Sequence, residues 1–266
     1  MVEKDRSSPP SPQIVSAFGG VGAPVLLPGG RGLTWRAGHV VLRPTGDAVE
    51  TAWKSGVLAK LPKSSEFSVP RPLMDEEGSW VRGGWHAMEW VPGESDETRV
   101  DDIVRAGLAF QEAITVEPRP SFIEASSDPW SRADRMAWGE VASPNDSLLA
   151  RIGSECRSIA APEQVIHGDL LGNVMFADGP PPVVIDWAPY WRPPGLGAAI
   201  AVVDAVCWHG YPLRKLGRDF GIEHWRQLLL RALLFRTTTL HLLGYWTDDQ
   251  HQRHVPVADA IIALRD

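Results

Sequence analysis

The pattern of apolar residues changes once along the chain, near Pro92 and Gly93. Before this point, short apolar runs separated by turn residues predict a mostly antiparallel sheet. After it, apolar residues recur at helical spacing over most of the sequence. We therefore predict an α+β fold with a small β-rich part over 13–91 and a larger helical part over 92–266. The polar, proline-rich segment 1–12 is predicted to be a disordered tail.

One helix is expected among the strands of the first part. Asp47 can cap this helix, and Glu50 follows three residues later, which is the pattern of a capping box. Pro62 then ends the helix. The expected helix spans 47–61, and the expected strands span 24–27, 33–36, 39–43, 67–69, 80–82 and 85–91.

The second part is predicted to be helical around a small strand–loop–strand insert. The expected helices span 100–114, 130–141, 148–160, 197–208, 223–243 and 256–264, and the expected strands span 165–166, 174–176 and 183–185. Three arginines interrupt the apolar stretch 225–246, so it indicates a core helix rather than a membrane span.

Composition narrows the class of protein. The chain has 266 residues, 44% hydrophobic and 22% charged, as in ordinary globular proteins. A net charge of −7 argues against a nucleic-acid partner. Cys156 and Cys207 lie in apolar helical patterns without metal-ligand spacing, which favours buried free thiols. The N-terminus has no signal-peptide pattern, so we expect a cytoplasmic protein with no membrane partner.

Three polar residues stand at the ends of the insert strands. The segment VIHGDLLGNVMF carries Asp169 and Asn173, and VVIDW carries Asp186. A hairpin would bring their loops together. One carboxylate and one amide oxygen make a partial shell for Mg²⁺, and the other carboxylate can accept a proton from a hydroxyl. This set suffices for phosphoryl transfer, whereas the competing interpretation is ordinary turn chemistry between strands.

This segment resembles the catalytic and metal loops of aminoglycoside phosphotransferases, choline kinases and related protein-kinase-like enzymes. The resemblance implies a bilobal protein-kinase-like fold in which Asp169 is the catalytic base, and Asn173 and Asp186 hold Mg²⁺. It also implies that His167 pins the loop and that Asp204 braces it. An ordinary paired helix carboxylate is the alternative for Asp204.

The chain departs from the family pattern at two places. Three residues separate Asp169 from Asn173, where the family usually has four, and Gly172 can absorb the change because glycine reaches backbone conformations closed to other residues. Arg43 takes the position at which such folds normally carry a phosphate-binding lysine. Arginine can bind phosphate as a fork but is not equivalent to lysine.

The resemblance implies that the first part is a nucleotide-binding N-lobe. Gly30, Arg31 and Gly32 would cover phosphates with backbone N–H groups, although a plain hairpin turn explains them too. Glu50 would pair with Arg43, although the capping box also accounts for Glu50.

Backbone groups of Glu89 and Val91 would contact a purine, which leaves ATP and GTP both possible. Candidates for the acceptor pocket are Asp128, Trp130, Asp134, Tyr190 and Trp191, each of which a cap or core role would also explain.

The function expected from the sequence is that of a small-molecule kinase. It would transfer the γ-phosphoryl group of a nucleotide to a substrate hydroxyl with Mg²⁺. The alternative is a nucleotide-binding pseudokinase with a regulatory role, which the short loop and Arg43 motivate. A protein kinase is disfavoured because the proline-rich segment after Asp186 leaves little room for a peptide-docking loop.

Overall fold

The computed structural model describes residues 8–29, 32–114 and 118–265. The chain divides into two units, Met1–Gly93 and Glu94–Asp266.

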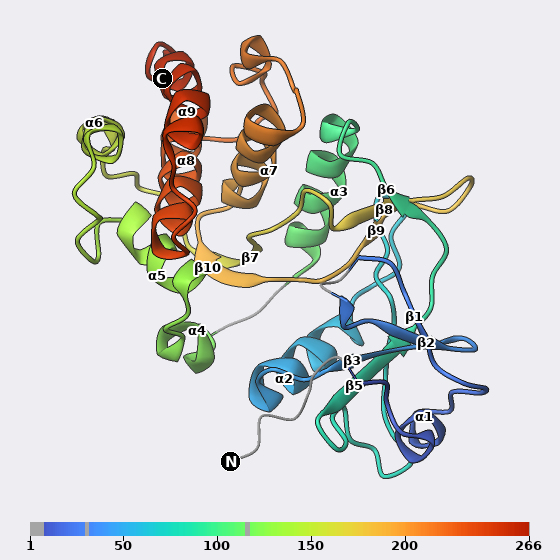
Figure 1. The fold of residues 1–266 in the computed structure, drawn as a ribbon. Coiled ribbons are helices and arrows are strands. Elements are labelled where there is room, and N and C mark those ends of the chain that lie inside the picture. The colour runs from blue at the N-terminus through green and yellow to red at the C-terminus, as the bar shows by residue number, and fades with distance from the viewer. Residues whose placement is uncertain (1–7, 30–31, 115–117, 266) are drawn as a thin grey trace. The chain divides into compact units, whose positions relative to one another are not determined.

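The first unit is built on an antiparallel sheet with the strand order β1-β2-β3-β5-β4 (Figure 1). The strands are β1 (Val25–Leu26), β2 (Trp35–Ala37), β3 (Val40–Pro44), β4 (Pro72–Leu73) and β5 (Trp85–Glu89). Helix α1 (Pro12–Ala17) packs Val15 and Phe18 against buried residues of β2, β3 and β5. Helix α2 (Ala48–Leu58) begins after Asp47, whose carboxylate accepts hydrogen bonds from the N–H groups of Val49 and Glu50.

Ser11 caps α1, which begins at Pro12, and the predicted disordered tail 1–12 stays a prediction. Two expectations for this unit differ from the structure. The strand predicted at 67–69 is replaced by β4, because the apolar character of Phe67 reflects burial in a loop. The segment 80–82 forms only an isolated bridge between Arg82 and Trp85.

The second unit is helical around two small sheets. Its helices are α3 (Val100–Ala113), α4 (Ser121–Ala125), α5 (Pro129–Ala137), α6 (Ser147–Glu155), α7 (Leu196–Trp208), α8 (Trp225–Leu242) and α9 (Asp248–Ile262). Its strands are β6 (Glu94–Ser95), β7 (Gln164–His167), β8 (Val174–Phe176), β9 (Val183–Val184) and β10 (Pro189–Arg192). They form a pair, β10-β7, and a three-stranded sheet, β6-β8-β9, and all pairings are antiparallel.

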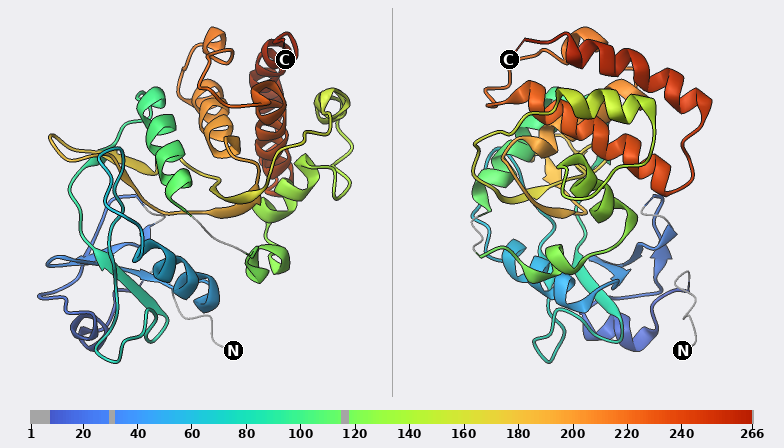
Figure 2. Two further views of the ribbon diagram at one scale, coloured as in Figure 1. Left: turned by 180° about the vertical axis from the view of Figure 1, so that it is seen from behind. Right: turned by 90° about the vertical axis from the view of Figure 1, so that its left-hand side faces the viewer.

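Helix α8 is the centre of the second unit. It contacts α5, α6, α7 and α9, and both views in Figure 2 show α9 running beside it. Its buried leucines and Phe235 join the main apolar core together with α7. Of the described helices, none is both long and apolar enough to cross a bilayer.

The last helix starts earlier than the sequence pattern suggested. The sequence pattern predicts a helix over 256–264. In the structure Thr247 caps α9, and Pro256 lies inside it. The short elements α4, β6 and β10 were not predicted, because elements of two to five residues carry too little periodicity to be recognised.

Candidate active site

The loop between β7 and β8 carries Asp169 and Asn173, and Asp186 follows β9. Strands β8 and β9 pair with Val174 opposite Val184. This register continues beyond the strands, because the N–H of Ile185 donates to the carbonyl of Asn173 at 2.9 Å. The backbone therefore joins the loop that holds Asn173 to the residue before Asp186.

The side chain of Asn173 is oriented by Asp169. Its Nδ2 donates to the Asp169 carbonyl at 2.7 Å and lies 3.3 Å from Oδ2 of the Asp169 carboxylate. Because an amide nitrogen can only donate, these contacts fix which end of the amide is which. The Oδ1 atom of Asn173 is then the acceptor that remains for a cation.

The shortened loop closes as a tight turn. The N–H of Asn173 donates to the carbonyl of Leu170 at 2.9 Å, and Gly172 between them has φ +79°. A positive φ at the third residue of a four-residue turn is typical of type II and strongly favours glycine. Gly172 therefore supplies the backbone conformation that a three-residue spacing needs.

His167 joins the two loops through both ring nitrogens. The N–H of Asp169 donates to Nδ1 at 3.1 Å, so Nδ1 carries no proton. The other nitrogen, Nε2, lies 3.1 Å from the carbonyl of Ile185, to which it must donate. Together these contacts tie the backbone at Asp169 to the backbone just before Asp186.

Asp186 has a backbone conformation that is rare for a side-chain-bearing residue. Its φ is +50°, and of the other described non-glycine residues only His224 is also positive. Such conformations are concentrated at functional sites.

On the other side of the loop, Tyr190 packs so closely on Gly168 that an added Cβ would lie 2.4 Å from its ring.

A buried arginine connects two of the predicted acids. The Nε of Arg236 in α8 donates to both carboxylate oxygens of Asp204, at 2.8 and 3.0 Å. Its Nη2 bonds Asp204 at 2.5 Å and Oδ1 of Asp169 at 2.7 Å. Asp204 reaches Asp169 through this guanidinium. The sequence analysis did not assign Arg236 to the site, although an arginine in a core helix signals a buried charge that needs carboxylate partners.

The electrostatics of this cluster hold Arg236 in its charged form. Burial acts to lower the pKa of Arg236, but the carboxylates of Asp204 and Asp169 outweigh it and raise the pKa above its usual value. The exposed fraction of the side chain is 9% for Asp204 and 49% for Asp169. Asp169 is therefore the member of the cluster that a substrate can reach.

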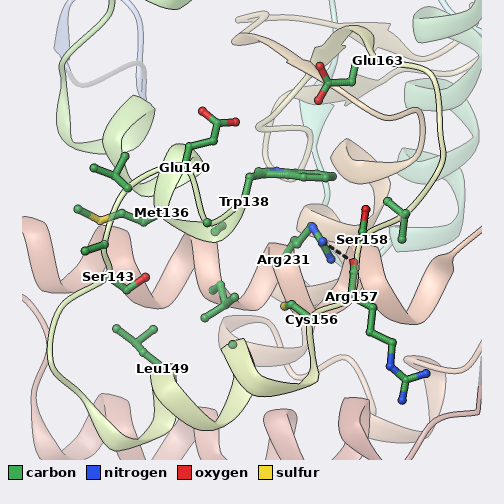
Figure 3. A pocket seen from close by; sticks show the side chains of 17 residues that line it. Met136, Trp138, Glu140, Ser143, Leu149, Cys156, Arg157, Ser158, Glu163 and Arg231 are labelled. Atoms are coloured by element: carbon green, nitrogen blue, oxygen red, sulfur yellow. Dashed lines mark hydrogen bonds between the residues drawn. The ribbon is translucent and has the colours of Figure 1, made fainter.

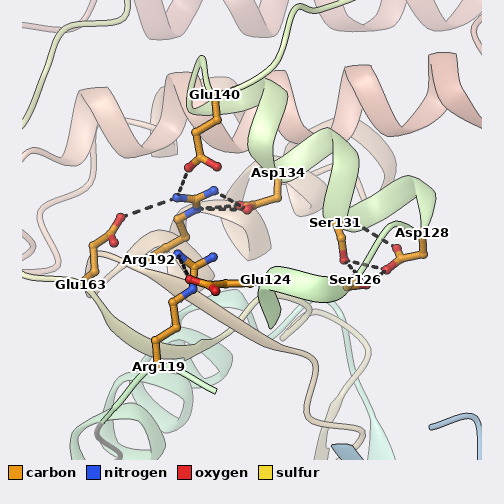
Figure 4. A network of polar contacts seen from close by, with 9 residues as sticks. All are labelled: Arg119, Glu124, Ser126, Asp128, Ser131, Asp134, Glu140, Glu163 and Arg192. Carbon is orange, nitrogen blue, oxygen red and sulfur yellow. Dashed lines mark hydrogen bonds and ion pairs between the residues drawn. The ribbon is translucent and has the colours of Figure 1, made fainter. Parts of the chain in front are cut away.

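A second network takes up Asp134, a predicted acceptor-site residue (Figure 4). The guanidinium of buried Arg192 in β10 bonds both carboxylate oxygens of Asp134 at 2.6 to 3.1 Å, and Glu140 at 2.6 Å. Asp128 caps α5 and also bonds Ser126 and Ser131. Both acids have structural partners in the fold.

Gly30 and Arg31, two candidates for the nucleotide site, lie outside the described residues. Gly32 has φ +68°, and its N–H donates to the Gly29 carbonyl at 3.0 Å, as in a tight turn. Arg43 lies in β3 opposite His86.

Two other nucleotide-site candidates already have partners. Glu50 pairs with Lys54 at 2.9 Å, one turn along α2, and the predicted pair of Glu50 with Arg43 stays a prediction. The N–H of Glu89 donates to the Arg71 carbonyl at 2.8 Å. The predicted purine contact stays a prediction for Glu89 and Val91, and the occupied Glu89 N–H leaves only its carbonyl to make it.

The donor set suits a hard divalent cation. Within 8–29, 32–114 and 118–265, no three His, Cys, Asp or Glu side chains gather as a metal cage. Mg²⁺ does not need one, because it binds through one or two carboxylates and otherwise keeps waters and phosphate oxygens. The free amide oxygen of Asn173 and the carboxylate of Asp186 fit that requirement.

Comparison with known protein families also indicates a phosphotransferase. Residues 40–190, more than half of the chain, match a family model described as "Phosphotransferase enzyme family". Among curated protein sequences, none matches.

Several solved structures share the fold at low sequence identity. Spectinomycin phosphotransferase with ADP and spectinomycin is 12% identical, with a TM-score of 0.54 over 94% of this chain and 96% of that one. A thermostable aminoglycoside phosphotransferase with AMP-PNP and hygromycin B is 15% identical, with a TM-score of 0.55 over 94% and 96%. A choline/ethanolamine kinase family protein from Mesorhizobium loti is 17% identical, with a TM-score of 0.51 over 98% and 92%. The predicted fold class is thereby confirmed.

Proposed function

The chain belongs to the phosphotransferase enzyme family, and we propose that it transfers the γ-phosphoryl group of ATP or GTP to a hydroxyl of a small molecule with Mg²⁺. The observation that carries the proposal is the linkage of Asp169, Asn173 and the loop of Asp186 through the bonds of Asn173 and His167. Phosphoryl transfer depends on positioning and charge neutralisation, and this linkage supplies the positioning.

Asp169 is the proposed residue that orients the acceptor. Arg236 engages its Oδ1, whereas Oδ2 accepts only the longer bond from Asn173 and keeps a lone pair for an incoming hydroxyl. The hydroxyl oxygen forms a bond to the γ-phosphorus while the bond between this phosphorus and the β–γ bridging oxygen breaks. The proton of the hydroxyl passes to the carboxylate of Asp169. The nucleoside diphosphate leaves with the electron pair of the broken bond.

Asn173 and Asp186 are the proposed metal-binding residues. A bound Mg²⁺ would neutralise phosphate charge during transfer. In Asn173 the amide nitrogen is committed to Asp169, which holds the oxygen in a defined orientation. Asp204 and Arg236 position Asp169 without touching substrate, and His167 holds the two loops in register.

The test is the Asp186→Ala variant. Magnesium-dependent nucleotide binding should weaken by at least tenfold, because a carboxylate ligand is lost. Binding in EDTA should be unchanged and serves as the control. Equal affinity of wild type and variant in Mg²⁺ would contradict the metal assignment.

The acceptor is best sought among chemically distinct hydroxyl compounds. The similar structures include a spectinomycin phosphotransferase, an aminoglycoside phosphotransferase bound to hygromycin B and a choline/ethanolamine kinase family protein. A panel of aminocyclitols, amino alcohols and neutral sugars with ATP and with GTP covers these classes. We place this reaction in the cytoplasm, where both nucleotides and Mg²⁺ are available.

One observation favours a pseudokinase as a second candidate. The ion pair with Arg236 occupies one oxygen of Asp169, which leaves fewer lone pairs of this carboxylate for a substrate hydroxyl. A pseudokinase would be stabilised by Mg²⁺ and nucleotide without turnover. Slow nucleotide hydrolysis that is lost in Asp169→Asn would exclude this candidate.

A further inference from the structure

Arg231 is a buried cation without an anionic partner. Its side chain in α8 is only 6% exposed. Its Nη1 bonds the backbone and side-chain oxygens of Gln227, at 3.3 and 3.1 Å, and its Nη2 bonds the carbonyl of Arg157 at 2.7 Å. Its Nε is buried without an acceptor. Within the described chain, no carboxylate lies within ion-pair distance of this guanidinium.

The other arginines of the same core differ. Arg226, one and a half turns earlier in α8 and 7% exposed, pairs with Glu155 at 2.7 Å. Arg192 pairs with Asp134 at 2.6 Å, and Arg236 with Asp204 at 2.5 Å. A buried charge is costly unless it is paired. Arg231 is therefore the exception in a unit that otherwise neutralises its buried guanidinium groups.

A cavity of about 800 Å³ opens beside Arg231 (Figure 3). Its lining residues come from the end of α5, the α5–α6 connection, α6, the segment that follows α6, and α8, and they include Trp138, Leu149, Cys156, Ser158, Ile159 and Leu234. The guanidinium of Arg231 lies over the indole of Trp138, 4.5 Å from the ring centroid. The site thus combines an unneutralised cation with walls of mixed polar and apolar character, and it is far larger than an inorganic ion requires.

We propose that this cavity is a second binding site of the enzyme, for a small organic monocarboxylate whose charged end pairs with Arg231 and whose apolar body contacts Leu149 and Leu234. Two features select this class. The size of the cavity and its aromatic and aliphatic lining residues favour an organic body over a bare ion. Arg157 also lines the cavity, but Glu140 and Glu163 offset its charge, so a monoanion suits the site better than a phosphate dianion.

The site is distinct from the phosphotransfer centre. Arg231 and Arg236 are five residues apart in α8, and Arg236 is committed to Asp204 and Asp169. None of Asp169, Asn173 and Asp186 lines the cavity. The proposal therefore stands or fails separately from the proposed reaction.

The experiment uses benzoate as the probe and the full chain as the protein. Benzamide, which has the same shape without the charge, and chloride at equal ionic strength are the controls. Benzoate should raise the unfolding temperature of wild type in a saturable manner, whereas benzamide and chloride should not. Binding of benzoate and benzamide with equal affinity would overturn the proposal.

Two variants locate the effect. Arg231→Met should weaken benzoate binding by at least about tenfold, the value of one charged hydrogen bond. The matched control Arg226→Met removes a paired arginine from the same helix and should keep the benzoate-induced shift relative to its own unfolding temperature. An unchanged shift in Arg231→Met would refute the assignment.

A third variant blocks the cavity and leaves Arg231 intact. Gly153 lies in α6 on the cavity wall, and a Cβ added there meets no atom within 4 Å. Gly153→Leu should therefore fold and fill the cavity, and benzoate binding should be lost. Retained binding in Gly153→Leu would contradict the proposal even if Arg231→Met does not fold.

Discussion

Two arginine-centred clusters in the second unit use the same chemistry with different outcomes. Arg192 gathers Asp134 and Glu140, and Arg236 gathers Asp204 and Asp169. In the first cluster the more buried acid, Asp134, accepts hydrogen bonds from Arg192 at both carboxylate oxygens and has a structural role. In the second cluster the buried acid Asp204 takes the bidentate contact, and half-exposed Asp169 keeps one oxygen outside the pair. In both clusters the more exposed acid, Glu140 or Asp169, takes a single contact from the shared arginine. The comparison teaches that sharing an arginine does not by itself set the role of the exposed acid; Asp169 differs from Glu140 because it lies in the loop beside Asn173.

The sharpest test of this contrast is Asp169→Asn. We expect turnover to fall about 10²- to 10⁴-fold, as for loss of a general base, with little change in the unfolding temperature. Steady-state kinetics with an accepted substrate measure turnover, and thermal unfolding measures the unfolding temperature. Turnover within tenfold of wild type would remove Asp169 from the reaction.

The matched change in the other cluster is Asp134→Asn. The free energy of unfolding should fall by about 3–5 kcal/mol, because Arg192 loses its main partner in a buried site. Chemical denaturation measures this loss. Turnover per folded molecule should stay near wild type, and its loss at unchanged stability would show that the two clusters do not differ as described.

Arg236→Lys tests the sharing itself. Lysine keeps the charge but cannot bond Asp204 with two nitrogens while one of them also bonds Asp169. We expect the free energy of unfolding to fall by about 1–3 kcal/mol and kcat to fall with KM for nucleotide unchanged. Equal kinetics in Arg236→Lys and wild type would show that charge alone is sufficient.

A smaller effect is expected in the loop between these acids. Gly172→Ala places a side chain at φ +79° and should cost about 1–2 kcal/mol of stability. Gly153→Ala, in open space within α6, is the control and should stabilise by about 0.4–1 kcal/mol. Denaturation curves of both variants decide whether the backbone conformation at Gly172 causes the loss of stability.

The smallest effect concerns a buried site with no counter-charge. Burial lowers the pKa of His254, whose Nε2 has no partner while Nδ1 lies 2.6 Å from the Gln250 carbonyl. As the pH falls, the unfolded chain therefore takes up a proton on this histidine before the folded chain does. The stability that the histidine contributes above a pH of about 6.5 is lost as the pH falls toward its pKa in the folded protein. Unfolding temperatures from pH 7.5 to 5 should decline less in His254→Phe than in wild type.

The sequence predicted those parts of the site that depend on local patterns. Apolar strands that end in Asp169 and Asp186, and a glycine before Asn173, are visible within about twenty residues, and their placement at strand ends follows from the pattern. The pair of Asp204 with Arg236 spans 32 positions between two helices. No local periodicity reveals which buried arginine will meet which acid.

The missed elements have a similar cause. The two residues of β6 become a strand only because β8 pairs with them, and β10 exists because it lies against β7. Asp134 is a candidate for the acceptor pocket or for a core role, and the Arg192 contact that neutralises it comes from position 192, across the fold. Tertiary partners, not propensity, decided each of these cases.

The position of Arg236 has a consequence for synthesis on the ribosome. Both Asp169 and Asp204 leave the exit tunnel before the helix that brings their shared cation. Until then the nascent chain lacks the guanidinium that joins these two carboxylates. A polypeptide that stops at residue 224 would therefore carry every motif of the loop without the ion pairs that connect Asp169 to Asp204.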